Sequence, residues 1–276
     1  AVIFTLADAL YLRPFRFPDV DRLVMIASDK IAETPFLDKE SVAPADFRDW
    51  TTSVAAVQGL AAAEWWDPNF SGVDTPEQVP GFRVSPGFFE LLGARPLLGR
   101  TFTAEDGQFE AHRKAVLSHK FWQRQFGGAS SVLGTTIRLD GEAYEVVGVM
   151  PPRFAIPMGA DVWAPLAYDA AGWAERKRGT LMTFGRLAPG ASIDAARAEL
   201  TAAHAAVVRE HPDAYAPTAN VRLTLSRLRD QITAPARTIL LLLLAAAAVV
   251  FVIACSNVAN LILARSVRRE GELAVR

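Results

Sequence analysis

The stretch TLMTFGRLAPGASIDAARAELTAAHAAVVREHPDAYAPTANVRLTL, residues 180–225, decides the fold. Thr180 to Leu187 predicts a strand, Pro189-Gly190 a turn, and Ser192 the N-cap of a helix that extends to about Glu210. Asn220 to Leu225 predicts the next strand, so the stretch as a whole is a βαβ element. The helix is predicted because its apolar residues recur at helical spacing, namely Ile193, Ala196, Leu200, Ala203 and Val207.

Three further helices are predicted before this element. One begins at Pro44, because proline is favoured in a first turn and acidic residues follow it. A short one is expected between Ser85 as its cap and Gly93 as its stop. The third covers Ser118 to Phe126 and ends at Gly127-Gly128.

A β-hairpin is predicted after the third helix. Its strands are Thr135 to Leu139 and Glu142 to Val149, joined by a type I′ turn at Asp140-Gly141. We therefore expect an α+β fold class: a mixed α/β extracytoplasmic domain, with the βαβ element and a hairpin-containing subdomain, joined to transmembrane helices.

A long uncharged run lies near the C-terminus. The 27 residues from Thr238 to Ala264 carry no charge and lie between Arg237 and Arg265. As a helix they would reach about 40 Å, more than the roughly 30 Å of a bilayer core. Buried helices of soluble proteins rarely run so far without a charge, so we predict a transmembrane helix over 237–264. The apolar residues 1–12 are too short to span, and fit either the outer end of a truncated first span or a core helix.

The flanking sequence predicts the orientation of this helix. Both sides are rich in arginine, but the N-terminal side belongs to the long segment 13–236, and long loops translocate largely regardless of charge. We therefore place 13–236 outside the cytoplasm and 265–276 inside it. The chain begins with Ala1 and ends within a helical pattern, so both ends are expected to be truncated.

Composition and motifs exclude several functions. The net charge of −1 gives no footprint for nucleic acid, and Cys255 is the single cysteine, so there is no intrachain disulfide. The sequence has no GxxxxGK[ST] phosphate loop, no HExxH, no CxxC and no GxSxG. We assign no catalytic residue, no cofactor and no metal, and expect no enzymatic activity in this chain.

Histidine and acidic pairs give no convincing active site. The histidine pairs have no further ligands, and the acidic pairs are typical of solvated loops. These pairs are His112 with His119, His204 with His211, Glu105 with Asp106, and Asp38 with Glu40.

Two short runs are candidate contact surfaces. The run Arg176-Lys177-Arg178 predicts an exposed basic loop. Contact of this loop with a partner or with lipid headgroups is a less favoured alternative. Trp65-Trp66 is the most unusual pair, since neighbouring strand positions face opposite ways and one ring should therefore be exposed. Packing remains the simpler interpretation, and contact with substrate or a partner is the weaker hypothesis.

Several strings, in order along nearly the whole chain, resemble a MacB-like periplasmic core followed by the start of an FtsX-like permease segment. They are also similar to the large permeases of acidobacteria. The strings are ADALYLRPFRFPDVDRLV (7–24), SVAPADFRDW (41–50), FRVSPGFFELLGARPLLGRTFTAEDG (82–107), AVLSHKFWQRQFGGASSVLGTTIRLDGEAYEVVGVMPPRF (115–154), DVWAPL (161–166), FGRLAPGASIDAARAEL (184–200) and SNVANLILARSVRREGELAVR (256–276).

The resemblance implies a permease of an ABC-type exporter or mechanotransmission complex in the bacterial inner membrane, multi-pass in its full length. A first span would end near Leu12. A separate ABC ATPase subunit would hydrolyse ATP, and the movement would pass to the periplasmic domain. Further implied partners are a second permease subunit, membrane lipid, and a periplasmic or outer-membrane protein; no nucleic acid is implied.

The segment after the predicted span is the candidate coupling site for that ATPase. Its charges include both signs, whereas anchoring to anionic lipid would use basic residues alone. The candidate residues are Arg268, Arg269, Glu270, Glu272 and Arg276. Two alternatives stay open: a membrane-anchored extracytoplasmic sensor or ligand-binding protein, and an anchored extracytoplasmic enzyme.

Overall fold

The computed structural model describes residues 19–30, 41–71, 76–152, 154, 156, 159–215, 221–230 and 242–260. A domain within residues 15–228 and the apolar helix Leu242–Asn260 belong to separate units, and each is described by itself. The candidate coupling residues, the predicted first span and the acidic pair Asp38 and Glu40 lie outside the described residues.

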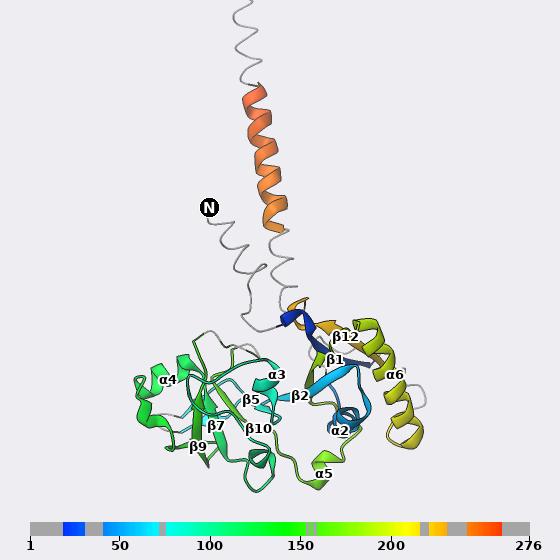
Figure 1. Cartoon of the computed structure of the whole chain (residues 1–276). Coiled ribbons are helices and arrows are strands. Elements are labelled where there is room, and N and C mark those ends of the chain that lie inside the picture. Colours follow the sequence, from blue (N-terminus) through cyan, green and yellow to red (C-terminus); the bar gives the residue numbers. More distant parts are fainter. Residues whose placement is uncertain are drawn as a thin grey trace, which may run out of the picture. The chain divides into compact units, whose positions relative to one another are not determined.

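Within the described part of the domain, twelve strands form one sheet in the order β12-β1-β11-β2-β5-β10-β7-β9-β8-β3-β4, with β6 paired to β9 (Figure 1). The strands are β1 (Leu23–Lys30), β2 (Val57–Trp65), β3 (Asn69–Phe70), β4 (Glu77–Gln78), β5 (Gly81–Val84), β6 (Leu98–Gly99), β7 (Lys114–Leu117), β8 (Thr136–Leu139), β9 (Glu142–Val149), β10 (Val162–Pro165), β11 (Leu181–Leu187) and β12 (Val221–Arg227).

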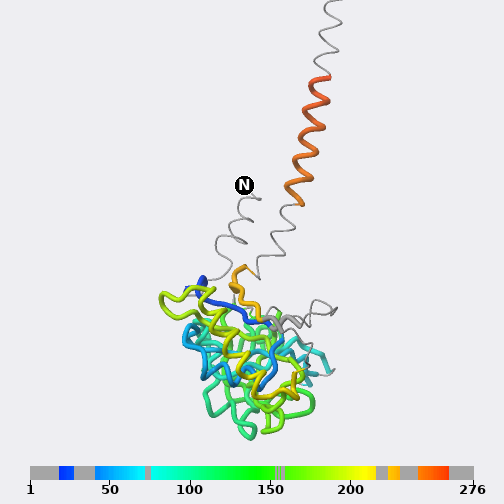
Figure 2. The backbone as a smooth tube through the Cα atoms, turned by 90° about the vertical axis from the view of Figure 1, so that its right-hand side faces the viewer, coloured from blue at the N-terminus to red at the C-terminus, as the bar shows by residue number. Residues whose placement is uncertain are grey.

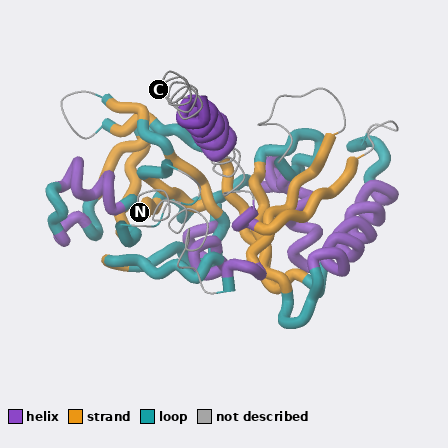
Figure 3. The backbone as a smooth tube through the Cα atoms, turned by 90° about the horizontal axis from the view of Figure 1, so that it is seen from above, coloured by secondary structure: helices purple, strands orange, loops and turns teal. Residues whose placement is uncertain are grey.

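The helices flank this sheet (Figure 3). The α-helices of the domain are α2 (Pro44–Ser53), α3 (Phe88–Leu91), α4 (His119–Phe126), α5 (Ala170–Trp173) and α6 (Ile193–Glu210), and the short 3-10 helices are η2 (Val20–Arg22), η3 (Glu105–Gly107) and η4 (Ser130–Val132).

The predicted βαβ element lies in one part of the domain, which we call the first lobe. This lobe consists of β1, β2, β11 and β12 with α2, α5 and α6. Strand β1 lies between β11 and β12 and is antiparallel to both, so β11 and β12 are parallel but not adjacent. Ser192 is the N-cap of helix α6, its side chain accepting a hydrogen bond from the Ala195 amide, and the helix packs on β12. The predicted apolar stripe faces this lobe's core, which also contains Val24, Ile26, Trp50, Leu181 and Leu225.

The chain enters and leaves the first lobe at one end. Val24 near the start of β1 is opposite Arg227, the last residue of β12. Figure 2 shows the blue β1 and the gold β12 side by side at this end of the domain. The intervening chain therefore forms the rest of the domain before it returns to its starting point.

The predicted hairpin lies in a part of the domain that we call the second lobe. This lobe consists of β3, β4 and β6 to β10 with α4. Leu139 pairs with Glu142, and Asp140 (φ 51°) and Gly141 (φ 81°) are both left-handed, as a type I′ turn requires. Helix α4 stops at Gly127 (φ 60°), as predicted, and Ser118, predicted as its first residue, is its N-cap. The core of the second lobe includes Leu117, Phe121, Leu139, Val146 and Val162.

Strand β5 joins the two lobes, since it pairs with β2 on one side and β10 on the other. Beside it is a chain of aromatic rings in contact, from Phe184 of β11 to Trp163 of β10. Phe88 and Phe89 of α3 connect these two, with Phe102 and Phe154 around them.

One helix cap differs from the prediction. Ser85 does not cap α3; Gly87 occupies the N-cap position with φ 83°. The Ser85 hydroxyl accepts a hydrogen bond of 2.9 Å from the buried Ala62 amide instead. An unpaired buried amide is more costly than an uncapped helix of four residues, which explains the difference. Gly93 follows the helix with φ 69°, as predicted for its stop.

The apolar helix Leu242–Asn260 has 19 residues and a mean hydropathy of 2.5 over its most apolar window. Its described side chains are exposed, including Leu244, Val250 and Phe251. Its length and composition are compatible with anchoring in a membrane.

Candidate functional site

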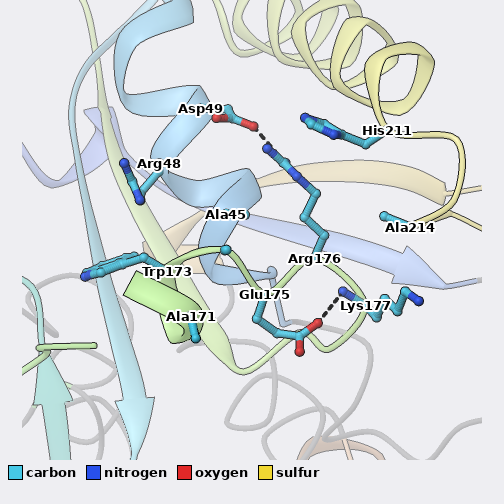
Figure 4. A pocket seen from close by; sticks show the side chains of 11 residues that line it. Ala45, Arg48, Asp49, Ala171, Trp173, Glu175, Arg176, Lys177, His211 and Ala214 are labelled. Carbon is cyan, nitrogen blue, oxygen red and sulfur yellow. Dashed lines mark hydrogen bonds and ion pairs between the residues drawn. The ribbon is translucent and has the colours of Figure 1, made fainter. Parts of the chain in front are cut away.

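A pocket of about 700 Å³ opens in the first lobe between α2, the segment around α5 and the chain beyond α6 (Figure 4). Helix α2 contributes Ala45, Arg48 and Asp49 to its wall. Most of residues 171–177 form a second wall, and His211 and Ala214 form the third. The pocket therefore joins three segments that are distant in sequence.

Two carboxylates of α2 hold the guanidinium of Arg176 in the wall of this pocket. Arg176 Nη1 lies 3.0 Å from Asp46 Oδ1 and 2.7 Å from Asp49 Oδ2. The Arg176 and Asp46 side chains are only 16% and 8% exposed. Burial opposes the charge of Arg176, but the hydrogen bond to Asp49 contributes to a net rise of its pKa. The guanidinium of Arg176 therefore stays charged and fixes the 175–178 loop to α2.

Tyr215 and His204 extend this cluster into the core. The Tyr215 hydroxyl donates a short hydrogen bond to Asp46 Oδ1. Burial, and then that hydrogen bond to Asp46, raise the pKa of Tyr215. The His204 ring packs against Tyr215 and Trp50, with centroids 5.6 and 5.7 Å away.

His204 is 5% exposed, and neither of its ring nitrogens has a hydrogen-bond partner among the described residues. Burial lowers the pKa of His204; the charge of Asp46 raises it, and that of Arg176 lowers it further. The imidazole is therefore held neutral in the folded domain. Together, Asp46, Arg176, Tyr215 and His204 form what we call the polar cluster.

The prediction of an exposed basic loop at Arg176-Lys177-Arg178 is wrong for its first residue. Lys177 and Arg178 are exposed, but Arg176 points inward to α2. The loop turns because Glu175 Oε1 accepts hydrogen bonds from the backbone amides of Lys177 (2.6 Å) and Arg178 (3.2 Å). This local closure directs the Arg176 side chain toward the two aspartates.

A similar correction applies to Asp106, which is not a solvated loop residue. It is 4% exposed and accepts from Arg100 Nη1 at 2.6 Å and from the Thr103 amide at 2.8 Å. Burial would raise the pKa of Asp106, but the bonds from Arg100 and Thr103 outweigh it and lower that pKa. Asp106 is therefore a structural anchor for the loop after β6.

Trp65 and Trp66 lie away from the pocket and face opposite ways. Trp65 is 58% exposed, packs edge-on against Phe82 at 4.8 Å, and donates to Asp67 Oδ2 at 2.6 Å. Trp66 is 9% exposed and donates to Asp140 Oδ2 at 2.9 Å. Of the two, Trp65 is the ring that can meet another molecule.

Among the residues that the structure describes, no group of three or more His, Cys, Asp or Glu could hold a metal ion. The polar cluster was not predicted from the sequence, although one signal pointed to it. His204 falls between Leu200 and Val207 in the apolar stripe of α6, where a histidine must be buried. Its partners come from other parts of the chain and gave no pattern of their own.

Comparisons with known proteins agree with this fold. The family model of the MacB-like periplasmic core domain matches residues 1–203. A search of curated proteins found no match.

Three solved structures are similar at low identity. A domain of a Porphyromonas gingivalis protein described as a permease has a TM-score of 0.57 and 15% identity, over 77% of this chain and 93% of that one. The periplasmic region of MacB from Actinobacillus actinomycetemcomitans has a TM-score of 0.56 and 12% identity, over 78% of this chain and 92% of that one. The extracellular domain of YknZ, a noncanonic ABC-type transporter from Gram-positive bacteria, has a TM-score of 0.53 and 15% identity, over 74% of this chain and 99% of that one.

These likenesses establish the fold, and the family model covers well over half of the chain. The chain belongs to the MacB-like periplasmic core domain family, which consists of periplasmic domains of ABC-type transporter permeases.

Proposed function

We propose that this chain is part of the permease subunit of an ABC-type exporter or mechanotransmission complex. A separate cytoplasmic ATPase hydrolyses ATP, and the resulting movement changes the conformation of the periplasmic domain. The observation that carries this proposal is the succession of a periplasmic core domain, matched over 1–203, and the apolar helix Leu242–Asn260. The chain itself contributes no catalytic residue in this scheme.

We place residues 13–236 outside the cytoplasm, a membrane-spanning helix at 237–264, and residues 265–276 inside. The permease is a multi-pass protein of the bacterial inner membrane and works as a dimer. Residues 1–12 are the outer end of a first span. This arrangement gives the ATPase a cytoplasmic surface to act on and leaves the polar cluster on the opposite side of the membrane.

Cysteine labelling tests this topology in the full-length protein. The native Cys255 is first replaced by serine, and Ser130→Cys and Ser266→Cys are made separately in that background. Ser130 is exposed in the second lobe, so its replacement should not disturb the fold. An impermeant maleimide applied to intact spheroplasts should label position 130 only. Labelling of position 266 under the same conditions would show that the orientation is wrong.

We assign ATPase contact to Arg268, Arg269, Glu270, Glu272 and Arg276. The support is their mixed charge, because the acidic residues gain nothing from an anionic membrane surface but can meet a basic protein surface. Glu272→Lys in the full-length protein should uncouple ATPase stimulation from transport without changing membrane insertion.

Glu210→Lys is a matched control, since it makes the same charge change at an exposed residue of the periplasmic domain. If Glu272→Lys binds the ATPase and exports as well as the control does, the segment anchors to lipid and does not couple.

We also assign to Trp65 a contact with substrate or a periplasmic partner, on the strength of its exposed ring. Trp65→Ala should then reduce transport while ATPase binding is unchanged.

A further inference from the structure

The pocket of the first lobe has the volume of a small-ligand site. Its volume of about 700 Å³ lies within the range of about 300–1,000 Å³ typical of such sites. The small side chains of Ala45, Ala171, Ala174 and Ala214 leave it open, and the Trp173 indole gives it one flat aromatic wall. An apolar or aromatic group of a ligand can pack on this surface.

The acidic groups in the wall are already satisfied by the chain itself. Asp49 is bound to Arg176 at 2.7 Å. Glu175 accepts two backbone hydrogen bonds from its own loop. Neither carboxylate therefore needs a cation from a ligand.

Arg48 has the opposite character. Its side chain is exposed and its guanidinium carbon lies 5.9 Å from the centre of the Trp173 ring (Figure 4). Among the described residues it has no carboxylate partner. A guanidinium has five donors in a planar fork that matches a carboxylate, so Arg48 offers an unused anion-binding group beside an aromatic wall.

The neighbouring acids limit the charge of the anion. A dianionic phosphate near Arg48 would meet repulsion from Asp49 and Glu175, whereas a single carboxylate would meet less. His211, which is exposed and whose ring has no partner among the described residues, supplies a second polar group on the far wall. The preferred ligand is thus a monoanion with an apolar body.

We propose that the pocket between α2, α5 and the chain beyond α6 binds a carboxylate carried on an apolar or aromatic group, held by Arg48 and stacked on Trp173. A peptide C-terminus and a free aromatic acid share this chemistry. Binding would connect three segments of the first lobe, and it is independent of whether the chain couples to an ATPase.

The test uses the 276-residue chain in detergent, labelled with 5-fluorotryptophan and followed by ¹⁹F NMR. Trp173→Phe identifies the Trp173 resonance. The probes are N-acetyl-Ala-Ala-Phe with a free C-terminal carboxylate, the same peptide as its C-terminal amide, and phenylacetate. We expect the free peptide to shift the Trp173 resonance saturably, and the amide to bind at least about tenfold more weakly, because a charge-assisted hydrogen bond is lost.

Arg48→Gln should weaken binding of the free peptide by about tenfold or more, and Arg178→Gln, an exposed arginine outside the pocket, should leave it unchanged. The other tryptophan resonances show whether each variant is folded. Tighter binding of the peptide than of phenylacetate identifies a peptide ligand; equal binding identifies a free acid. Equal affinity for acid and amide, no effect of Arg48→Gln, or no shift at about 10 mM probe would overturn the proposal.

Discussion

The two lobes of the domain satisfy their buried polar groups to different extents. In the second lobe, Trp122 Nε1 donates to the Ala129 carbonyl at 2.9 Å, and Ser118 Oγ binds both the Phe121 amide and Asp161. In the first lobe, polar atoms of Trp50, Thr183 and His204 are buried without a hydrogen-bond partner among the described residues. Trp163, at the aromatic contacts between the lobes, shares this property.

The difference indicates where the domain has room to change. Buried polar atoms without partners cost about 1–3 kcal/mol each, so the first lobe stores unfavourable free energy that a rearrangement could release. The same lobe contains the pocket and the polar cluster. The second lobe has one such residue among those described, Trp163 of β10, against three in the first lobe, and it is expected to move as one body. Four measurements, all by chemical denaturation of the chain in detergent followed by tryptophan fluorescence, test this contrast.

The largest effect is expected from a buried aspartate in each lobe. Asp46→Asn should destabilise the domain by about 2–3 kcal/mol, because Arg176 is largely withdrawn from solvent (16% exposed) and keeps only Asp49 as an ionic partner. Asp161→Asn in the second lobe should cost about 1 kcal/mol, because Arg124 is more exposed and also pairs with Glu77 at 2.7 Å. If the two variants lost the same free energy of unfolding, the expected difference between the lobes would be wrong.

A tryptophan pair tests the hydrogen bonds themselves. Trp122→Phe removes volume and also one of the two hydrogen bonds that the Ala129 carbonyl accepts, the other coming from the Val132 amide at 3.3 Å, so we expect a loss of about 2 kcal/mol. Trp50→Phe removes the same volume but breaks no hydrogen bond within the described residues, so its loss should be about 1 kcal/mol smaller. The reverse order would mean that Trp50 Nε1 is satisfied in solution.

The third effect depends on pH through His204. Its pKa in the folded domain is below the ordinary value near 6.5, so the unfolded chain binds more protons between the two values. Stability is therefore complete above about pH 6.5 and falls as pH decreases through the folded-state pKa. His204→Leu should remove this slope and gain about 1 kcal/mol at pH 5. Trp50→Phe, a neighbour that does not titrate, should keep the slope.

The smallest effects should be the same in both lobes. Glu142 is 56% exposed in its ion pair with Arg113, and Asp194 is 80% exposed in its pair with Arg197. Glu142→Gln and Asp194→Asn should each cost only about 0.5 kcal/mol, because exposed ion pairs are screened by solvent. A larger loss in the first lobe alone would show that its instability is not confined to buried groups.

Local patterns explain which parts of the fold could be predicted. The stripe of α6, the Gly127 stop of α4 and the Asp140-Gly141 turn each depend on neighbours in sequence, and each is confirmed. The position of β1 between β11 and β12 was not predicted, because residues 23–30 must pair with strands that lie more than 150 residues further along the chain. No local pattern encodes such pairing.

The candidate sites divide in the same way. The exposure of Trp65 follows from strand alternation, but the Arg176–Asp46 contact spans 130 residues and the Tyr215–Asp46 contact spans 169. Arg176 therefore looked like part of a solvated basic run. The assignment of 268–276 to ATPase coupling came from charge and resemblance, and it stays a prediction.

The shared end of β1 and β12 has a mechanical consequence. A tensile force that separates Leu23 from Arg227 acts across two neighbouring strands and breaks their ladder of hydrogen bonds one pair at a time, beginning beside Val24. A force that moves both ends together puts no load on that ladder. With the two proposed spans attached at these ends, the domain would follow them when they travel as a pair, and the β1–β12 pairing would open one residue pair at a time if they were drawn apart.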